Sequence, residues 1–330
     1  MRPASRSAAI DSLPAPLIRR FAADLAGIRP GEGRIALVVS GGPDSLALLL
    51  LAHAAIPGQF AVATVDHRLR AESAGEAAMV AALCTALGIA HATIALDLAG
   101  GSGVQARARA ARYAALGEWM REGGLHALVT AHHADDQAET LVMRLNRGAG
   151  LRGLAGMRPV AAVPGHDLPL LRPLLRWHRA TLGDVCRAAG VVAVDDPSNR
   201  DARFERARVR AAMAAADWIE PAGLGASAAH LAEADAALDW AAQQAMAGLR
   251  DDGAGGLAWM PDVPRAIALR VLERIVARIG STTPRGAEVA RWHDALATGG
   301  VATLAGVRGD GRGAQWRFTP APPHRSGAAQ

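Results

Sequence analysis

The segment Ser40-Gly-Gly-Pro-Asp-Ser45 holds the residues of this chain that are best suited to chemistry. It follows an apolar run, residues 35–39, that is typical of a buried strand, and it leads into an apolar stretch that predicts a helix. The small side chains of Ser40, Gly41 and Gly42 let a ligand approach the backbone N–H groups. Such a turn at the start of a helix favours anions, because the N–H groups and the helix dipole both attract negative charge. We therefore expect a phosphate or pyrophosphate site here.

This turn differs from the better-known P-loop, which needs a lysine side chain to reach the β- and γ-phosphates. The chain contains no lysine, since all 36 of its Lys and Arg residues are arginine. The pattern S-G-G-x-D-S resembles the pyrophosphate-binding loop of the N-type ATP pyrophosphatases. This resemblance implies that the turn holds the β- and γ-phosphates of ATP as a leaving unit, so that attack falls on the α-phosphorus. Asp44 is predicted to be a catalytic residue that also binds Mg²⁺. The predicted ATP contacts in the turn are Ser40, Gly41, Gly42, Pro43, Asp44 and Ser45.

A second pair of polar residues follows the next apolar run. Asp66 and His67 come directly after residues 60–65. At the end of a strand they suit the adenine amino group or the ribose, and we predict that both contact ATP. An aspartate in this place is also a common helix N-cap, so that alternative stays open.

Residues 131–140, Ala-His-His-Ala-Asp-Asp-Gln-Ala-Glu-Thr, carry more polar groups than a core needs. On a helix, Asp136 and Glu139 share one face, and carboxylates at a helix start are favoured by its dipole. We predict that both are catalytic, that Asp136 binds Mg²⁺ with Asp44, and that His133 contacts ATP. A His/Asp centre for a transition metal and a purely structural role are the alternatives.

Arginines are concentrated near these motifs. Residues 1–210 hold 25 arginines against 19 acidic residues, whereas residues 211–330 hold 11 against 12. Basic segments beside a nucleotide site predict a phosphate-rich partner larger than ATP, with a solvated basic face as the alternative. Arg109 and Arg112 share a face of the helix predicted for residues 104–122. We expect Arg112 to reach the phosphates or the α-phosphoryl transition state, with a role as a surface arginine as the alternative. Residues 147–157 contain G-x-G-x-x-G after a helix rather than a strand, so we expect a flexible basic loop for RNA and not a dinucleotide site.

Strand and helix patterns alternate along the first part of the chain. The expected strands are residues 35–39, 60–65, 92–96, 127–130, 170–174 and 191–194, and the expected helices are 44–53, 72–87, 104–122, 135–146 and 179–189. This alternation predicts an α/β fold with a doubly wound parallel sheet and ligands at the carboxyl ends of its strands. A smaller, mainly helical C-terminal domain is expected to follow, with a hairpin near residues 308–312. The expected divisions are a catalytic domain at 1–214, a helical domain at 215–320 and a disordered tail at 321–330.

Composition excludes several classes of protein. The longest apolar run, residues 46–56, is too short to span a bilayer, and the N-terminus lacks the apolar core of a secretory signal. Cys84 and Cys186 are far apart and lie outside every motif. We therefore expect no membrane association, no disulfide partner and no cysteine metal cluster. These features predict a cytoplasmic enzyme.

Taken together, the motifs resemble those of the tRNA(Ile)-lysidine synthetases, which are N-type ATP pyrophosphatases with an adenine nucleotide α-hydrolase-like (PP-loop) fold. The resemblance covers about residues 33–212. Arg68 stands where that family commonly has Gly, Ala207 stands where Asn is frequent, and the C-terminal part matches only loosely. The matching segments, in the order seen in the family, are 40–45, 65–70, 106–113, 131–140, 147–157, 171–175 and 196–201.

The resemblance implies a tRNA-modifying ligase that uses ATP and Mg²⁺. ATP adenylates the 2-carbonyl oxygen of the wobble cytidine in a tRNA(Ile) with a CAU anticodon, and free L-lysine then displaces AMP to leave lysidine. Flipping a base out of an RNA loop fits such a reaction. Arg206 completes the predicted catalytic set. The predicted tRNA contacts are Arg147, Arg152, Arg203 and Arg208.

Three other functions fit the sequence less well. A tRNA 2-thiolase needs catalytic cysteines or an iron–sulfur cluster, and the two cysteines lie outside every motif. A small-molecule synthetase of the NAD or GMP type leaves the basic segments and the Asp-Pro-Ser-Asn segment at 196–199 unexplained. A non-catalytic RNA-binding module does not need Asp44, Asp136 and Glu139 beside a pyrophosphate loop.

Overall fold

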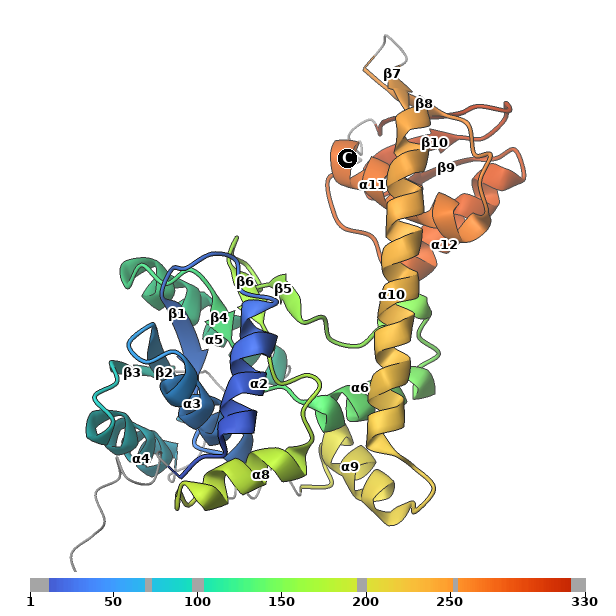
Figure 1. Cartoon of the computed structure of the whole chain (residues 1–330). Coiled ribbons are helices and arrows are strands. Elements are labelled where there is room, and N and C mark those ends of the chain that lie inside the picture. Colours follow the sequence, from blue (N-terminus) through green and yellow to red (C-terminus); the bar gives the residue numbers. More distant parts are fainter. Residues whose placement is uncertain (1–11, 69–72, 97–103, 195–200, 252–254, 322–330) are drawn as a thin grey trace, which may run out of the picture. The chain divides into compact units, whose positions relative to one another are not determined.

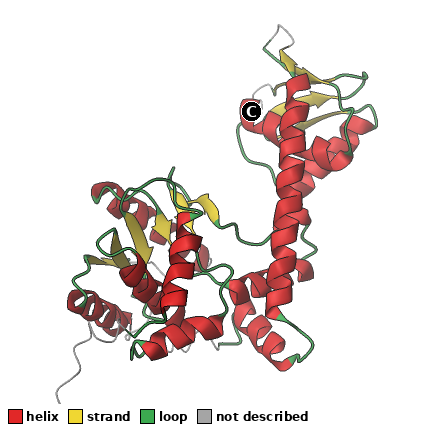
Figure 2. Cartoon of the chain, in the orientation of Figure 1, coloured by secondary structure: helices red, strands yellow, loops and turns green. Residues whose placement is uncertain are grey.

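The computed structural model describes residues 12–68, 73–96, 104–194, 201–251 and 255–321. By its internal contacts the chain divides into two compact units, residues 1–232 and 233–330, and the division falls within helix α10 (Pro221–Ala245). The first unit is a parallel α/β structure and the second combines a small antiparallel sheet with helices (Figures 1 and 2). Nearly all of the tail predicted to be disordered lies outside the described residues.

A six-stranded sheet with the order β3-β2-β1-β4-β6-β5 forms the centre of the first unit. Every neighbouring pair is parallel except β5 and β6. The strands are β1 (Ile35–Val38), β2 (Phe60–Asp66), β3 (His91–Ala95), β4 (Leu128–Val129), β5 (Val160–Ala162) and β6 (Pro169–Leu171). The chain runs from β1 outward to β3 and then returns to β4 on the other side of β1. Strands β1 and β4 therefore border the switch point, where doubly wound sheets bind their ligands.

Helices cover both faces of this sheet because side chains alternate along its strands. In β1, Ile35 and Leu37 belong to a core shared with α2, α3, α4 and α8, whereas Ala36 packs with Tyr113 and Leu116 of α5. Among the described residues, no helix is long and apolar enough to cross a membrane. The helices of this unit before α10 are α2 (Ala15–Ala26), α3 (Pro43–Ala55), α4 (Ser73–Ala86), α5 (Val104–Glu122), α6 (Ala134–Asn146), α7 (Leu151–Leu154), α8 (Arg179–Ala188) and α9 (Glu205–Ala215).

The strand predicted for residues 191–194 is wrong. The segment is irregular and follows α8, and the N–H of Val194 donates to the carbonyl of Gly41 at 3.0 Å. Its β-branched residues favoured a strand, but β propensity depends on a neighbouring strand to pack against. Here the segment braces the turn that follows β1.

The second unit contains a five-stranded antiparallel sheet with the order β7-β8-β11-β10-β9. The hairpin predicted around residues 308–312 is wrong in its pairing, because residues 307–310 form the strand β10, which lies between β9 and β11 and pairs with both. Edge-on contacts of Trp259 with Trp316 and of Trp292 with Phe318 fill its core. Its elements after α10 are η2 (Met246–Gly248), β7 (Arg250–Asp251), β8 (Leu257–Trp259), α11 (Arg265–Ile279), α12 (Gly286–Ala297), β9 (Val301–Leu304), β10 (Val307–Asp310) and β11 (Trp316–Pro320).

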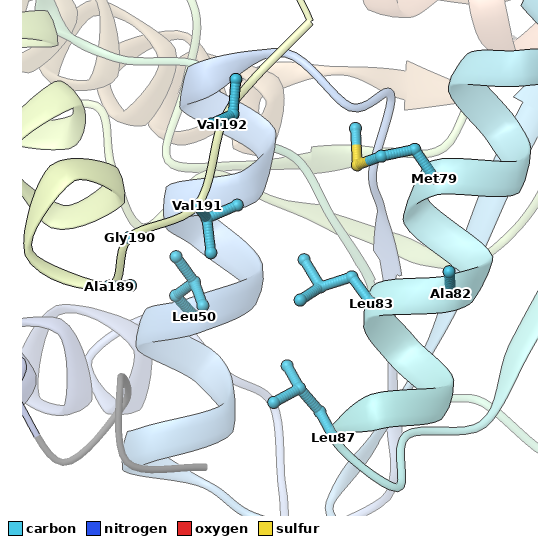
Figure 3. Close-up of a pocket in the computed structure, with 9 residues that line it drawn as sticks. All are labelled: Leu50, Met79, Ala82, Leu83, Leu87, Ala189, Gly190, Val191 and Val192. Atoms are coloured by element: carbon cyan, nitrogen blue, oxygen red, sulfur yellow. The ribbon is translucent and has the colours of Figure 1, made fainter. Parts of the chain in front are cut away.

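A cavity of about 270 Å³ lies in the first unit between α3, α4 and residues 189–192 (Figure 3). Its lining includes Leu50, Met79 and Leu83 and has no polar side chain. Phosphates and nucleobases need hydrogen-bond partners, so this cavity does not suit a nucleotide. The polar residues singled out in the sequence lie elsewhere, at the ends of β1, β2 and β4.

Candidate active site

The turn after β1 is held in shape by its own serines. Ser45 Oγ accepts a hydrogen bond from the N–H of Ser40 at 3.2 Å and donates to the carbonyl of Gly42 at 2.9 Å. Gly41 has a φ of +90°, a conformation that residues with a side chain rarely adopt. Helix α3 begins directly after Gly42, so its positive dipole end faces this turn. The geometry is that of an anion-binding turn.

His133 joins this turn to the helix that follows β4. The side chain is buried, and its Nε2 lies 3.4 Å from a carboxylate oxygen of Asp44 and 3.5 Å from one of Asp136. Its Nδ1 lies 3.5 Å from Asp135. Burial lowers the pKa of His133, but the three carboxylates outweigh burial and raise that pKa to about 9. His133 therefore lies between Asp44 and Asp136, which follow two adjacent strands of the sheet.

Glu139 lies one turn further along α6 and is only 3 % exposed. Its carboxylate accepts hydrogen bonds from Arg206 Nε at 2.9 Å, from Arg210 Nε at 2.6 Å and from Arg210 Nη2 at 3.1 Å. Both arginines come from α9, and their Nη2 atoms lie 3.7 and 4.0 Å from Asp136. The structure thus brings together Asp136, Glu139 and Arg206, and their catalytic role stays a prediction. The structure adds Arg210, which its spacing of four residues from Arg206 on a helix could have indicated.

Asp44 and Asp136 fit a magnesium ion that arrives with a triphosphate. Oδ1 of Asp44 is buried and has no hydrogen-bond partner among the described residues. Magnesium in nucleotide sites takes one or two protein carboxylates, and phosphates and water complete its shell. In the described ranges, no three His, Cys, Asp or Glu side chains are grouped to hold a metal by themselves.

Asp66 already has partners within the chain. Its Oδ1 accepts hydrogen bonds from Ser73 Oγ at 2.7 Å and from the N–H of Arg68 at 2.9 Å, and these bonds lower the pKa of Asp66. Nδ1 of His67 is buried and has no partner in the described part of the chain. Arg68 has a φ of +50°, in the left-handed region that glycine adopts more readily than a residue with a side chain. That Asp66 and His67 contact ATP stays a prediction.

Arg112 lies on α5 and stacks on Tyr113, with its Cζ 5.2 Å from the ring centre. Its Nε is buried and has no hydrogen-bond partner among the described residues. Burial lowers the pKa of His67, and the charge of Arg112 lowers it further. Burial likewise lowers the pKa of His132 to about 4, with a smaller contribution from the same guanidinium. Arg112 therefore adds positive charge near both histidines, and its action at the α-phosphorus stays a prediction.

Three of the four predicted tRNA contacts lie at the surface with intramolecular partners. Arg147 forms an ion pair with Glu205, and Arg203 binds Asp201 through Nε at 2.8 Å and Nη2 at 2.6 Å. Arg208 donates to the carbonyl of Ala202 at 2.7 Å. Such exposed ion pairs contribute little to the stability of the protein in water. A phosphate of the RNA can therefore replace the carboxylate as the partner of the arginine. The fourth, Arg152, lies on α7, and the whole Asp-Pro-Ser-Asn segment at 196–199 lies outside the described residues.

Comparisons with known proteins identify the family of this chain. Residues 17–216 match the PP-loop domain family. A tRNA(Ile)-lysidine synthase from Novosphingobium aromaticivorans is 59 % identical over 310 residues, which are 93 % of this chain and 94 % of that protein. The chain belongs to the tRNA(Ile)-lysidine synthase family. Another tRNA(Ile)-lysidine synthase, from Zymomonas mobilis, is 40 % identical over 95 % of this chain and 97 % of its own length.

A solved structure supports the fold of this lysidine synthase family member. The U34-tRNA thiolase NcsA from Methanococcus maripaludis superposes with a TM-score of 0.55 at 15 % identity, over 66 % of this chain and 77 % of that one. At this identity the likeness shows the fold alone. With the PP-loop match, it confirms the predicted doubly wound fold, and the match confirms the predicted use of ATP.

The two cysteines are not placed as sulfur carriers. Cys84 and Cys186 are both buried, and burial raises the pKa of each thiol to about 11. A nucleophilic cysteine needs a lowered pKa, because the thiolate is the reactive form. Cys186 lies against the binding turn, where its Sγ–H donates to the carbonyl of Pro43 at 3.2 Å. Its contribution there is to packing and hydrogen bonding.

Proposed function

We propose that this protein ligates L-lysine to C2 of the wobble cytidine of a tRNA(Ile) with a CAU anticodon, with adenylated tRNA as the intermediate. The observation that carries the proposal is the junction of Asp44, His133 and Asp136, which places an anion-binding turn beside a carboxylate pair. The named relatives support this choice of reaction within the PP-loop family.

In the first step the cytidine O2 attacks the α-phosphorus of ATP, the bond to the bridging oxygen of the β-phosphate breaks, and pyrophosphate leaves. The turn at residues 40–45 binds the β- and γ-phosphates of the leaving group. Asp44 and Asp136 would hold Mg²⁺, and the ion would supply positive charge at the departing pyrophosphate. Arg112 and Arg206 stabilise the charge that develops at the α-phosphoryl group, and such fixed positive charge is worth most in a site that excludes water.

In the second step the ε-amino nitrogen of lysine attacks C2 of the adenylated base. The bond from C2 to O2 breaks, AMP leaves with that oxygen, and the proton that the ammonium group must lose goes to solvent. The amine comes from free lysine, because this chain contains no lysine of its own. Glu139 is bound by the guanidinium groups of Arg206 and Arg210, so its carboxylate organises the site.

The tRNA is proposed to bind across the exposed arginines at positions 147, 152, 203 and 208. They occur on the glycine-containing loop after α6 and around the start of α9, the two helices that carry Glu139 and its partners. Contacts to phosphates set the position of an RNA without reading its sequence. The choice of cytidine at the wobble position is then made by the pocket that receives the flipped base.

The proposal is tested with labelled L-lysine, ATP, Mg²⁺ and two transcripts of the tRNA, one with the CAU anticodon and one with uridine at the wobble position. The CAU transcript should take up lysine, with one AMP and one pyrophosphate formed for each lysine bound. The uridine transcript should take up none. Equal uptake by both transcripts, or uptake without AMP, would contradict the proposed reaction.

A further inference from the structure

Gln137 lies on α6 between Asp136 and Glu139, but its side chain forms hydrogen bonds with the backbone of Met157. The side chain is 7 % exposed. Its Nε2 donates to the carbonyl of Met157 at 2.8 Å, and its Oε1 accepts from the N–H of the same residue at 2.7 Å. One amide therefore satisfies both backbone groups of Met157, as a neighbouring β-strand would.

The segment that Gln137 holds is the glycine loop, residues 147–157. Gly156 has a φ of +66°, and a Cβ added there would lie 2.7 Å from Oε1 of Gln137. Two turns further along α6, Nη1 of Arg144 donates to the carbonyls of Gly153 at 2.5 Å and Gly156 at 3.2 Å. The second half of the loop is thus bound to α6 at two points. This arrangement differs from the flexible loop expected from its glycines.

The first half of the same loop is connected to the other helix of the site. Arg147 forms an ion pair with Glu205 at the start of α9. Arg206, the next residue of α9, binds the carboxylate of Glu139. The glycine loop therefore contacts both helices that supply the charged groups of the site. Its position is coupled to theirs through these hydrogen bonds and ion pairs.

We propose that Gln137 is a positioning residue for the ligation, which fixes the glycine loop relative to Asp136 and Glu139. The inference rests on the proposed function, because it places Arg147 and Arg152 of that loop against the tRNA. A buried amide whose two groups are both paired specifies one arrangement of the loop, since any other arrangement leaves the amide unpaired. Gln137 acts through the loop and touches neither ATP nor lysine.

The test compares Gln137→Met with Arg144→Met and with a matched control, Leu141→Ala. Methionine keeps the length of glutamine and removes both hydrogen bonds to Met157. Leu141 is buried one turn along the same helix, so its truncation lowers the melting temperature without removing a loop hydrogen bond. The measurements are the melting temperature, the ATP dissociation constant, kcat and KM for tRNA, and amide exchange at Met157.

Gln137→Met is expected to lower kcat/KM for tRNA by about tenfold or more, because a displacement of about 1 Å can cost up to a hundredfold in rate. The ATP dissociation constant should change by less than about twofold, because the nucleotide turn is held by the hydrogen bonds of its own serines. Amide exchange at Met157 should accelerate. Arg144→Met should change kcat/KM in the same direction, whereas Leu141→Ala should leave it near the wild-type value.

Wild-type kcat/KM in Gln137→Met would overturn the inference. So would a loss of activity that matches that of Leu141→Ala at equal loss of melting temperature, since this would indicate a structural role only. Failure of the proposed function is distinguishable, because the wild-type protein would then form no lysidine. If only the positioning role fails, the wild-type protein still forms lysidine. The kcat/KM of Gln137→Met then equals that of the wild-type protein or that of Leu141→Ala.

Discussion

Replacing Glu139 by alanine should release helix α9 before the rest of the first unit unfolds. Helix α9 (Glu205–Ala215) has no fully buried side chain, so apolar burial contributes little to its attachment. Its strongest contacts with α6 are the hydrogen bonds of Arg206 and Arg210 to Glu139, and Arg206 also makes longer hydrogen bonds to Asp136 and Thr140. Removal of the carboxylate leaves two guanidinium groups facing each other.

The size of the effect follows from these bonds. A hydrogen bond to a charged group contributes about 1.5–3 kcal/mol, and each of the two arginines makes at least one with Glu139. Arg206 and Arg210 are 42 % and 27 % exposed, so water compensates for part of the loss. We expect a net loss of about 2–4 kcal/mol for the pair once this screening is included. At 1.4 kcal/mol per factor of ten, α9 should open roughly 30 to 700 times more often.

Hydrogen exchange followed by mass spectrometry measures this opening directly. In Glu139→Ala, peptides from α9 should exchange faster by the stated factor, while peptides from β1, β2 and α3 keep their protection. Glu139→Gln, which keeps an acceptor oxygen and loses the charge, should give a smaller increase. The control is Glu118→Ala, which removes an exposed carboxylate of α5. Unchanged exchange in α9 of Glu139→Ala would refute the reasoning, and so would equal acceleration throughout the unit.

Three further outcomes are expected. Asp44→Ala should slow pyrophosphate release by ~10²–10³ in single-turnover measurements without loss of secondary structure, and near-normal release would contradict the role of this aspartate. Replacing both Arg147 and Arg152 by glutamine should flatten the log–log dependence of tRNA affinity on salt by roughly 0.7–0.9 for each phosphate that is no longer neutralised, and an unchanged slope would place the RNA elsewhere. Asp235→Ala should destabilise the second unit by about 3 kcal/mol in thermal unfolding, because the substitution removes an ion-pair partner of the buried guanidinium of Arg270. A loss of stability below about 1 kcal/mol would show that Asp239 alone satisfies that guanidinium.

The parts of the site that follow directly from strands were predictable from the sequence. The turn at residues 40–45 and the polar cluster at 131–140 each follow an apolar run, and a doubly wound fold places such strand ends on one edge of the sheet. The segments are short and local, so the residue pattern alone indicates both the element and the ligand class. Helix α2 could have been predicted in the same way, since Phe21 and Leu25 recur at a spacing of four residues.

The remaining features depend on polar contacts between distant positions. Arg206 binds Glu139 across 67 residues of sequence, and Gln137 binds Met157 across 20. A polar side chain has no periodicity that indicates its partner, so neither contact could be read from the sequence. The same limit explains the irregular segment at residues 191–194, whose apolar pattern does not reveal whether a strand lies beside it.

The most direct test uses the double variant Cys84→Ser, Cys186→Ser with tRNA(Ile) bearing a CAU anticodon, ATP and Mg²⁺, with and without L-lysine. The wobble nucleoside is then identified by mass spectrometry. Lysidine should form at a rate close to that of the wild-type protein and only when lysine is present, because the nucleophile is the amine of free lysine and no thiol takes part. Thiocytidine, a product formed without lysine, or loss of activity in a variant that remains folded would contradict the proposed reaction.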